Sequence, residues 1–297
     1  MGVMERVERQ VGRVFEEVPE LYDRVRPAYP EDLFIDLAAI TGIDERSSVL
    51  EVGCGTGQAT RPLGALGCKV TAVELGHNMA ALARQRLASM PNVQVETSSF
   101  EDWDDRGRRF DIVVAASSWH WVDPSIGWTK AHRVLKRGGW LALLGHVVVR
   151  RPAEAEAYAE TIDLHERFVP GHPGWGHPPL ETEVRSTGQG WGPPNEDSDG
   201  LFGSTIVRWY PTVQWFNGEG FADLLRSTSL YRTLDDGVRE PLLNAIAERI
   251  RTQMGDRVSR RYLSVLRVGQ REHKPTQRRD ANELTQTITP HPPVHSK

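Results

Sequence analysis

Cysteine is scarce in this sequence, with two residues among 297. Cys54 and Cys68 provide neither a disulfide framework nor a zinc-binding pattern, so we expect two reduced thiols and no metal site. Long apolar runs are also lacking, because the longest, Trp140 to Val149, is too short to span a bilayer. No apolar segment of the signal-peptide type appears near the start, which is charged from Glu5 onward. We therefore expect a cytoplasmic protein with no membrane partner.

Neither sign of charge dominates the chain. It has 36 Lys and Arg residues against 40 Asp and Glu residues, for a formal net charge of −4. This balance leaves no electrostatic footprint for nucleic acid or for an anionic membrane. The hydrophobic content of 39% is enough for one large α/β core with a smaller cap. A small-molecule substrate is favoured, and nothing in the composition indicates an oligomeric state.

The most informative segment is an apolar run, Val49 to Val52, that breaks into three glycines spaced two residues apart. These are Gly53, Gly55 and Gly57. The pattern predicts a strand that feeds a turn. Glycine lets the backbone take positive φ and lets a ligand lie against bare main chain. In parallel α/β sheets such a turn lies at the ligand-binding edge.

Two classes of ligand use such a turn, and the glycine spacing separates them. A dinucleotide turn needs Gly-x-Gly-x-x-Gly, so that a pyrophosphate can lie on the next helix N-terminus. Here Gly57 comes one position early and Gln58 stands where Gly or Ala is needed. Glu51, two residues before the first glycine, would face the ligand and could attract a cationic group. A nicotinamide-dependent oxidoreductase is disfavoured but stays open as an alternative.

A second predicted strand, Lys69 to Glu74, ends in a carboxylate about twenty residues beyond the glycine turn. An acid at this position can accept both ribose hydroxyls of a nucleoside ligand. The alternative for Glu74 is a helix-capping or solvated acid. After a short loop, Asn78 is the expected N-cap of a helix from Met79 to Leu87.

The string Glu51-x-Gly-x-Gly-x-Gly57 resembles motif I of the class I S-adenosylmethionine-dependent methyltransferases. Later segments follow in the order of that family's later motifs: Phe110 to Val114, Trp119 to Val122, and Arg133 to Gly139. Upstream, the segment from Tyr22 to Pro30 is similar to the one before motif I in bacterial relatives of trans-aconitate methyltransferase. The resemblance covers most of residues 20 to 270.

The resemblance implies a Rossmann-like α/β fold. We expect a mostly parallel seven-stranded sheet with an antiparallel last strand, helices on both faces, and a cap of helices or loops. It also implies S-adenosyl-L-methionine as cofactor, S-adenosyl-L-homocysteine as product, and in-line methyl transfer to O, N or C of a small molecule. The expected cofactor-binding residues are Tyr22, Arg26, Glu51, Gly53, Cys54, Gly55, Thr56, Gly57, Glu74, Leu75, Ser99, Phe100, Ala116 and Ser117.

The sequence departs from the family at the adenine position. After a predicted third strand, Val93 to Thr97, the family usually has an Asp that contacts the adenine amino group. Here that position is Ser99, which accepts more weakly than a carboxylate, and Phe100 supplies the backbone N–H. Glu101 and Asp102 are expected to be solvated acids at a helix start. Because of this departure, a non-catalytic S-adenosylmethionine-binding regulator is a second alternative.

The loop after the fourth predicted strand should face the transferable group. Trp119 and Trp121 are its candidate substrate residues, and together with Tyr22 they could stabilise a positive sulfonium. His120 is the candidate general base, and its alternative is a hydrogen-bonded loop histidine. A carboxylate acceptor would instead need a cationic orienter such as Arg26. The family places Tyr22 and Arg26 at the cavity mouth, although Tyr22 could equally serve packing alone.

The remaining pattern predicts five parts of the chain. We expect N-terminal helices and a cofactor-covering segment over residues 1–45, a cofactor-binding core over 46–150, and a substrate-cap insertion over 151–202. Strands and helices that complete the sheet follow over 203–271, and a disordered tail over 272–297. The alternative for the insertion is a disordered segment.

Several elements are expected around the core. In the N-terminal part, helical spacing covers residues 4–16, a proline-pinned loop covers 21–30, and a second helix opened by Pro30 ends at Gly42. Asp123 and Pro124 are expected to open the helix after the fourth strand. The later expected elements are a helix Glu154 to Phe168, an aperiodic stretch Pro170 to Asn195, strands Ser204 to Tyr210 and Val213 to Phe216 separated by Pro211, a helix capped by Asn217, a helix Val238 to Met254, and a strand Arg261 to Val268.

Overall fold

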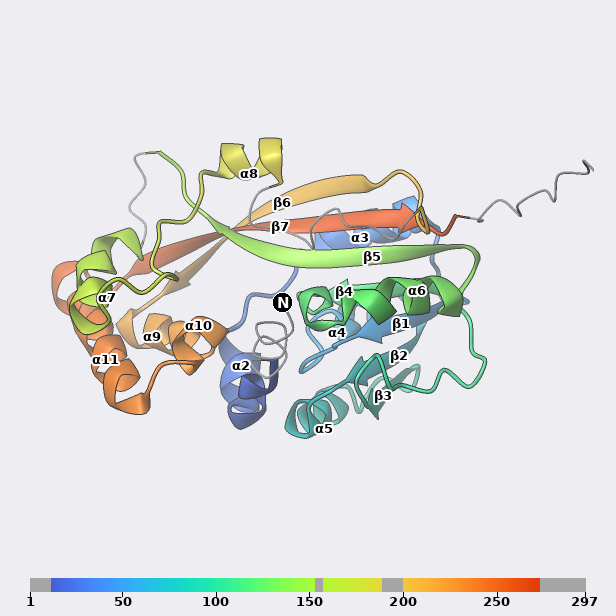
Figure 1. Ribbon diagram of the computed structural model, residues 1–297, viewed down its shortest axis with the longest axis horizontal. Helices are drawn as coiled ribbons and strands as arrows, with labels where there is room; N and C mark the ends of the chain where they lie inside the picture. The colour runs from blue at the N-terminus through green and yellow to red at the C-terminus, as the bar shows by residue number, and fades with distance from the viewer. Residues whose placement is uncertain (1–11, 153–156, 189–199, 273–297) are drawn as a thin grey trace, which may run out of the picture.

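A single seven-stranded sheet organises the protein (Figure 1). The computed structural model describes residues 12–152, 157–188 and 200–272. The strands are β1 (Ser48–Val52), β2 (Lys69–Glu74), β3 (Val93–Thr97), β4 (Phe110–Ala116), β5 (Leu135–Val149), β6 (Ile206–Phe216) and β7 (Val258–Gln270). Their order is β3-β2-β1-β4-β5-β7-β6, and β7 is antiparallel to both neighbours while the other pairs are parallel. The fold predicted from the motifs is confirmed.

The central strands are buried on both faces, which explains their continuous apolar runs. Along β1, Val49 and Leu50 point to opposite faces and belong to two different core clusters. The helices are α2 (Pro19–Val25), α3 (Glu31–Thr41), α4 (Thr60–Ala65), α5 (His77–Arg86), α6 (Pro124–Val134), α7 (Ile162–Phe168), α8 (Glu181–Thr187), α9 (Gly218–Arg226), α10 (Ser229–Arg232) and α11 (Asp236–Gln253), with short 3-10 helices η1 (Gly12–Glu17), η2 (Trp119–Trp121) and η3 (Ala159–Thr161). Residues of α3, α4 and α5 pack in one cluster and residues of α6 in the other, so helices cover both faces.

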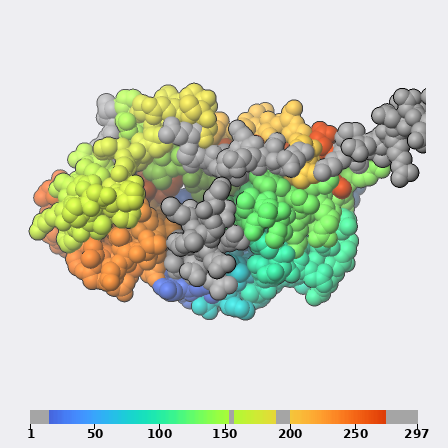
Figure 2. All heavy atoms as spheres, in the orientation of Figure 1, coloured from blue at the N-terminus to red at the C-terminus, as the bar shows by residue number. Residues whose placement is uncertain are grey.

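A third core cluster lies beside the sheet and forms a cap. It joins α7, α9, α10 and α11 with Val25 of α2, around residues such as Phe221 and Leu243 that are fully buried. These helices gather at one end of the sheet in Figure 1, and the space-filling view shows them to the left of α6 (Figure 2). None of the helices in the described ranges is both long and apolar enough to cross a membrane.

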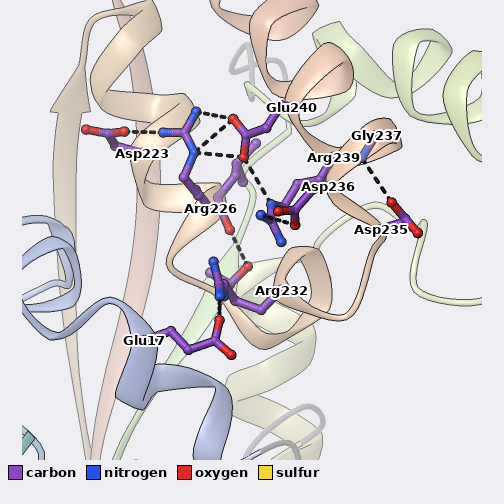
Figure 3. A network of polar contacts seen from close by, with 11 residues as sticks. Glu17, Asp223, Arg226, Arg232, Asp235, Asp236, Gly237, Arg239 and Glu240 are labelled. Carbon is purple, nitrogen blue, oxygen red and sulfur yellow. Dashed lines mark hydrogen bonds and ion pairs between the residues drawn. The ribbon is translucent and has the colours of Figure 1, made fainter. Parts of the chain in front are cut away.

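Ion pairs tie the cap together (Figure 3). Arg226 of α9 pairs with Glu240 of α11 at 2.9 Å, and Arg239, whose side chain is buried, contacts the same carboxylate at 3.1 Å. Arg232 of α10 reaches Glu17 of η1, and so connects the cap to the N-terminal segment. The N-terminal segment is therefore tied to the cap by this ion pair.

Two predicted N-terminal features are corrected. The segment expected to be a proline-pinned loop begins inside helix α2, which ends where Arg26 and Pro27 turn extended. The helix expected to start with Asn78 as N-cap instead begins at His77 after Gly76. The reason is that Glu16, distant in sequence, accepts the backbone N–H groups of Asn78 and Met79. The expected helix over 4–16 is described only from residue 12, where it is a 3-10 helix.

The second half of the chain also differs in three places. Pro211 does not separate two strands, because β6 is an edge strand in which proline's missing N–H costs no ladder bond. The stretch expected to be aperiodic contains helix α8, and its part from residue 189 lies outside the described residues. The expected helix Glu154–Phe168 appears as η3 and α7, and residues 153–156 lie outside the described ranges. Outside them as well are residues 273–297, where we predict disorder.

The remaining predicted elements are confirmed. Gly42, in the left-handed conformation, ends α3. Asp123 accepts a hydrogen bond from the Ser125 backbone at the start of α6, and Asn217 does the same from Gly220 at the start of α9.

Candidate active site

A cavity of about 1080 Å³ opens where the parallel strands end. Its wall includes the turns after β1, β2, β3 and β4, the middle of β5, and residues from η1 and α2. Ligand sites in open parallel sheets lie at this edge. The volume slightly exceeds the roughly 300–1,000 Å³ usual for one small-molecule pocket, so the cavity has room for two ligands.

The glycine turn after β1 forms part of this wall. Gly53 (φ +67°) and Gly55 (φ +58°) line the cavity. A Cβ on Gly53 would lie 2.5 Å from the Cβ of Ser118, so the β1 and β4 turns touch there. Gly57 and Thr56 do not line the cavity. The main chain of Gly57 instead faces Leu87, and the Thr56 hydroxyl donates to Asp23 at 2.9 Å.

Glu51 is a buried acid whose carboxylate has no hydrogen bond of normal geometry among the described residues. The residue is fully buried, it lines the cavity, and neither carboxylate oxygen has a hydrogen-bond partner within the described residues. Burial raises the pKa of Glu51 to about 8, the nearby Thr60 hydroxyl opposes the rise, and the charge of Glu74 adds to it. An unsatisfied carboxylate in a buried place is costly, so this side of the cavity is suited to a cationic ligand group.

Glu74 is held in place by the turns around it. One carboxylate oxygen accepts the N–H of Gly55 at 2.8 Å, and the other accepts the N–H of Gly76 at 2.9 Å. Burial raises the pKa of Glu74, and these two backbone donors oppose the rise. Glu74 thus links the glycine turn to the turn before α5, and it lines the same cavity as Glu51, together with Leu75.

The segment after β3 forms the wall beyond Glu74. Ser99 and Phe100 line the cavity, and so do Glu101 and Asp102. No helix begins here, contrary to the sequence prediction, since residues 100–102 form a turn. Glu101 is not simply solvated, because it accepts the backbone N–H of Asp123 at 2.7 Å. Asp102 accepts the Ser99 hydroxyl at 2.7 Å.

The turn after β4 brings the predicted substrate residues to the cavity. Ala116 and Ser117 line it, and so do Trp119, His120 and Trp121 of η2. Trp119 is buried and packs edge-on against Trp128, so much of its surface serves the core. His120 is exposed at the cavity rim, although surrounding atoms lower its pKa by partial desolvation.

The N-terminal segment forms part of the cavity wall through residues of η1, α2 and the loop after α2. The Arg26 guanidinium lies over the Tyr22 ring at 4.8 Å and the Phe15 ring at 5.7 Å. One nitrogen donates to the backbone oxygen of Ser227 at 3.1 Å, whereas Nε has no partner within the described ranges. Ion pairs join Arg24 to Asp223 of α9 and Asp23 to Arg86 of α5.

Sequence reasoning did not assign three residues at the end of the cavity near β5 and β7. Tyr29 stacks on His146 at 4.2 Å, and Tyr262 meets the same imidazole edge-on at 5.9 Å. The Tyr29 hydroxyl hydrogen-bonds Ser117, a non-glycine residue at φ +54°. The signals were present, because Tyr29 lies inside the proline-rich motif and His146 interrupts an apolar strand.

His146 is a neutral imidazole. Its Nδ1 lies 2.9 Å from the Ser264 hydroxyl, while Nε2 is buried and has no partner in the part of the chain that the structure describes. Burial, with the charge of Arg26 adding, lowers the pKa of His146 to about 3, against the effect of the Pro27 carbonyl. No cluster of three metal-ligating side chains occurs in the described ranges.

The chain is similar to known methyltransferases. Residues 50–143 match the family described as methyltransferase domain. An uncharacterized methyltransferase of Mycobacterium bovis is 32% identical over 123 residues, which are 41% of this chain and 48% of that protein. Trans-aconitate 2-methyltransferase of Mycobacterium tuberculosis is 28% identical over 143 residues, 43% of this chain and 51% of that protein. The chain thus aligns with about half the length of these curated relatives.

Solved structures share the fold. A candidate type II methyltransferase from Anaeromyxobacter dehalogenans superposes with a TM-score of 0.57 at 22% identity, over 82% of this chain and 97% of that one. The YcgJ protein from Bacillus subtilis superposes with a TM-score of 0.50 at 16% identity, over 82% of this chain and all of that one. The solved structures confirm the fold, and the match over residues 50–143 supports the resemblance drawn from the motifs for that part of the chain.

Proposed function

We propose that this protein transfers a methyl group from S-adenosylmethionine to a small-molecule acceptor, because residues 50–143 match the family described as methyltransferase domain. One observation carries the proposal: Glu51 places a buried carboxylate without a partner in the described chain at the cavity wall beside the glycine turn. A cationic ligand group would pair with the ionised form of this carboxyl, which a pyrophosphate bridge cannot do. The nearly balanced net charge of −4 supports a small molecule rather than a nucleic acid as acceptor.

The residues of the cavity fit this cofactor. Glu51 would face its cationic part, and Arg26, whose Nε has no partner among the described residues, would face its carboxylate. Glu74 would accept the ribose hydroxyls. Gly53 and Gly55 would let the ligand approach the main chain. The aromatic rings of Tyr22, Trp119 and Trp121, together with wall residues Cys54, Leu75, Ser99, Phe100, Ala116 and Ser117, would surround the rest.

The chemistry asks for alignment more than for reactive groups. When bound, S-adenosylmethionine supplies an electrophilic methyl group on a positively charged sulfur. The chain then has to hold an acceptor in line with that methyl group and to exclude water. The remaining part of the cavity wall is lined by Tyr29, His146 and Tyr262. We place the acceptor against this part of the wall. O-, N- and C-methylation all remain compatible with it.

His146 is our first candidate for contact with the acceptor. Its neutral imidazole leaves Nε2 without a partner in the described chain, so this nitrogen can hold the proton-bearing group of an acceptor. His120, the base predicted from the sequence, lies at the exposed rim and is the second candidate. Trp119 and Trp121 would line the acceptor site between His146 and His120.

Calorimetric titration tests the cofactor. We expect wild-type protein to bind S-adenosylhomocysteine and to give no heat with NADH, since a pyrophosphate offers Glu51 no cationic partner. Glu74→Ala should weaken binding more than tenfold, or about 1.4 kcal/mol. Glu45→Ala, which removes an exposed acid far from the cavity, serves as the matched control. Tight NADH binding without a response to S-adenosylmethionine or S-adenosylhomocysteine would overturn the assignment in favour of an oxidoreductase.

A transfer assay then tests catalysis. Radiolabelled S-adenosylmethionine is incubated with panels of small carboxylates, phenols and amines, and label is counted in the product. Transfer to an acceptor at catalytic rates separates an enzyme from a protein that only binds the nucleoside. Binding of S-adenosylmethionine without methyl transfer to any compound in the panels would favour a non-catalytic regulator.

A further inference from the structure

The turn after β3 is fixed by a buried lysine. The Nζ of Lys130, on α6, donates to the backbone oxygens of Glu101 at 2.9 Å and Trp103 at 2.5 Å. The side chain is buried, and its ammonium lies over the rings of Phe100 at 5.3 Å and Trp103 at 5.9 Å. A buried charge needs its hydrogen bonds. Lys130 therefore orients the carbonyls of this turn.

Other contacts hold the same turn on both sides. The Trp103 indole donates to Glu96 of β3 at 2.7 Å, and the Trp103 backbone N–H donates to the backbone oxygen of Ser99 at 3.0 Å. Glu101 accepts the N–H of Asp123, just before α6, at 2.7 Å. The turn is thus a rigid part of the cavity wall.

Within this rigid turn, Ser99 and Asp102 form a closed pair. The Ser99 hydroxyl donates to one Asp102 oxygen at 2.7 Å and accepts the Asp102 backbone N–H at 3.1 Å. The hydroxyl proton is therefore committed to Asp102. The second carboxylate oxygen of Asp102 has no hydrogen bond recorded in the described chain, and the residue lines the cavity beside Ser99. The carboxylate is the stronger acceptor of the two side chains.

We propose that Asp102 is the residue that recognises the exocyclic amino group of the cofactor's adenine. Ser99 orients the carboxylate by its hydrogen bonds, and Lys130 is a positioning residue that fixes the turn. This inference rests on the proposed binding of S-adenosylmethionine. It moves the recognition of adenine from position 99 to an acid three residues later, which the hydrogen-bonded turn brings back beside it.

The chemistry predicts a specific selectivity. A carboxylate accepts hydrogen bonds from the 6-amino group of adenine and repels the 6-oxo group of hypoxanthine. The amide of an asparagine can present its carbonyl oxygen to the 6-amino group of adenine or its NH₂ to the 6-oxo group of hypoxanthine. We therefore expect Asp102→Asn to lose adenine affinity and, at the same time, to gain tolerance for the 6-oxo base.

The test compares S-adenosylhomocysteine with S-inosylhomocysteine by isothermal titration calorimetry. Wild-type protein should prefer the adenosyl compound by at least about tenfold. Asp102→Asn should weaken adenosyl binding by about tenfold or more and shrink or reverse the preference. Asp104→Asn is the matched control, because Asp104 is exposed on the same segment, accepts the Arg106 N–H and does not line the cavity. It should leave both affinities within about twofold.

The role of Lys130 is tested by the ratio of the affinities for the adenosyl and inosyl compounds rather than by stability. Lys130→Met should reduce the ratio of the two affinities when measured well below its melting temperature. A merely structural lysine would lower the melting temperature and leave that ratio unchanged. Lys136→Met, which removes an exposed ammonium paired with Asp111, is the control and should keep the wild-type ratio.

The outcomes separate this inference from the function on which it rests. No binding of S-adenosylhomocysteine by wild-type protein would overturn the proposed function itself. Wild-type binding with an unchanged preference in Asp102→Asn would overturn only the role of Asp102. Loss of the preference in Ser99→Ala, but not in Asp102→Asn, would return recognition of adenine to the serine.

Discussion

Protonation of Glu51 should control cofactor affinity. In the ligand-free protein the pKa of this buried carboxyl is about 8, so most molecules carry a neutral Glu51 near pH 6. A cationic ligand group needs the ionised form, and binding therefore releases a proton. With this pKa, about 0.3% of the carboxyl is ionised at pH 5.5 and about 9% at pH 7.0. The affinity for S-adenosylmethionine should rise about 30-fold over this range.

Calorimetry at several pH values measures this rise. The range lies below the ordinary pKa of about 7.7–8.0 of an α-amino group, so the ligand's charge is nearly constant. Glu51→Gln removes the titrating group but keeps Glu74, His120 and His146, and its weaker affinity should be nearly independent of pH. Glu45→Gln should retain the wild-type slope. Equal wild-type affinities at pH 5.5 and 7.0, or the same slope in Glu51→Gln, would refute the reasoning.

The same shift has a consequence for stability in the absence of ligand. The folded-state pKa of Glu51 lies above the value of 4.5 expected for an exposed glutamate. Between pH 4.5 and 8 the folded state therefore holds a proton that the unfolded state has lost, and the wild-type free energy of unfolding falls as pH rises. Glu51→Gln should be more stable than wild type by about 2–4 kcal/mol at pH 7.5 and about equal to it near pH 4.5. Urea denaturation of both proteins at the two pH values measures this difference, and no difference at pH 7.5 would contradict the raised pKa.

Three further predictions concern the cavity wall. Gly53→Ala should destabilise the fold by at least about 2 kcal/mol more than Gly107→Ala, as measured by urea denaturation. Both glycines have positive φ, but only a Cβ at Gly53 would clash, with Ser118. Equal losses of stability would mean that the turns after β1 and β4 can move apart. Tyr29→Phe should lower kcat while costing about 1 kcal/mol of stability, whereas Tyr210→Phe, which loses a bond to Asp36, should cost similar stability at unchanged kcat. His146→Ala should lower kcat for the identified acceptor by about 10²-fold or more with unchanged S-adenosylhomocysteine affinity, and wild-type kcat should show no His146 titration between pH 6 and 8. Unchanged kcat in the Tyr29 and His146 variants would place the acceptor elsewhere.

The sequence predicted the framework of the fold because the strands carry local signals. Buried parallel strands such as β1 and β4 are short apolar runs bounded by turn residues, and the glycines after Val52 mark where the first one ends. The order of the motifs then predicted the Rossmann-like class of the sheet. Glu51 and Glu74 were placed correctly on one cavity, since the carboxyl ends of neighbouring parallel strands meet at the same edge.

The parts that the sequence did not predict depend on contacts between distant residues. The start of α5 is set by Glu16, about sixty positions away, so the local preference of Asn78 for an N-cap position was overridden. Asp102 reaches the cavity only because its turn returns it to Ser99. His146 is exceptional through its surroundings rather than its neighbours in sequence, since Tyr29 and Ser264 come from other segments. No local sequence pattern predicts such contacts between distant segments.

The N-terminal segment that forms part of the cavity wall has a consequence for ligand exchange. Its pairs Arg24 with Asp223 and Asp23 with Arg86 involve partly exposed side chains. Pairs of this kind contribute about 0–1 kcal/mol each and weaken as salt screens them. Higher ionic strength should therefore weaken this part of the attachment while the buried contact of Val25 with the cap persists, and a bound nucleoside should leave sooner as ionic strength increases. Residence time in this protein thus depends on the surrounding electrolyte as well as on the cavity itself.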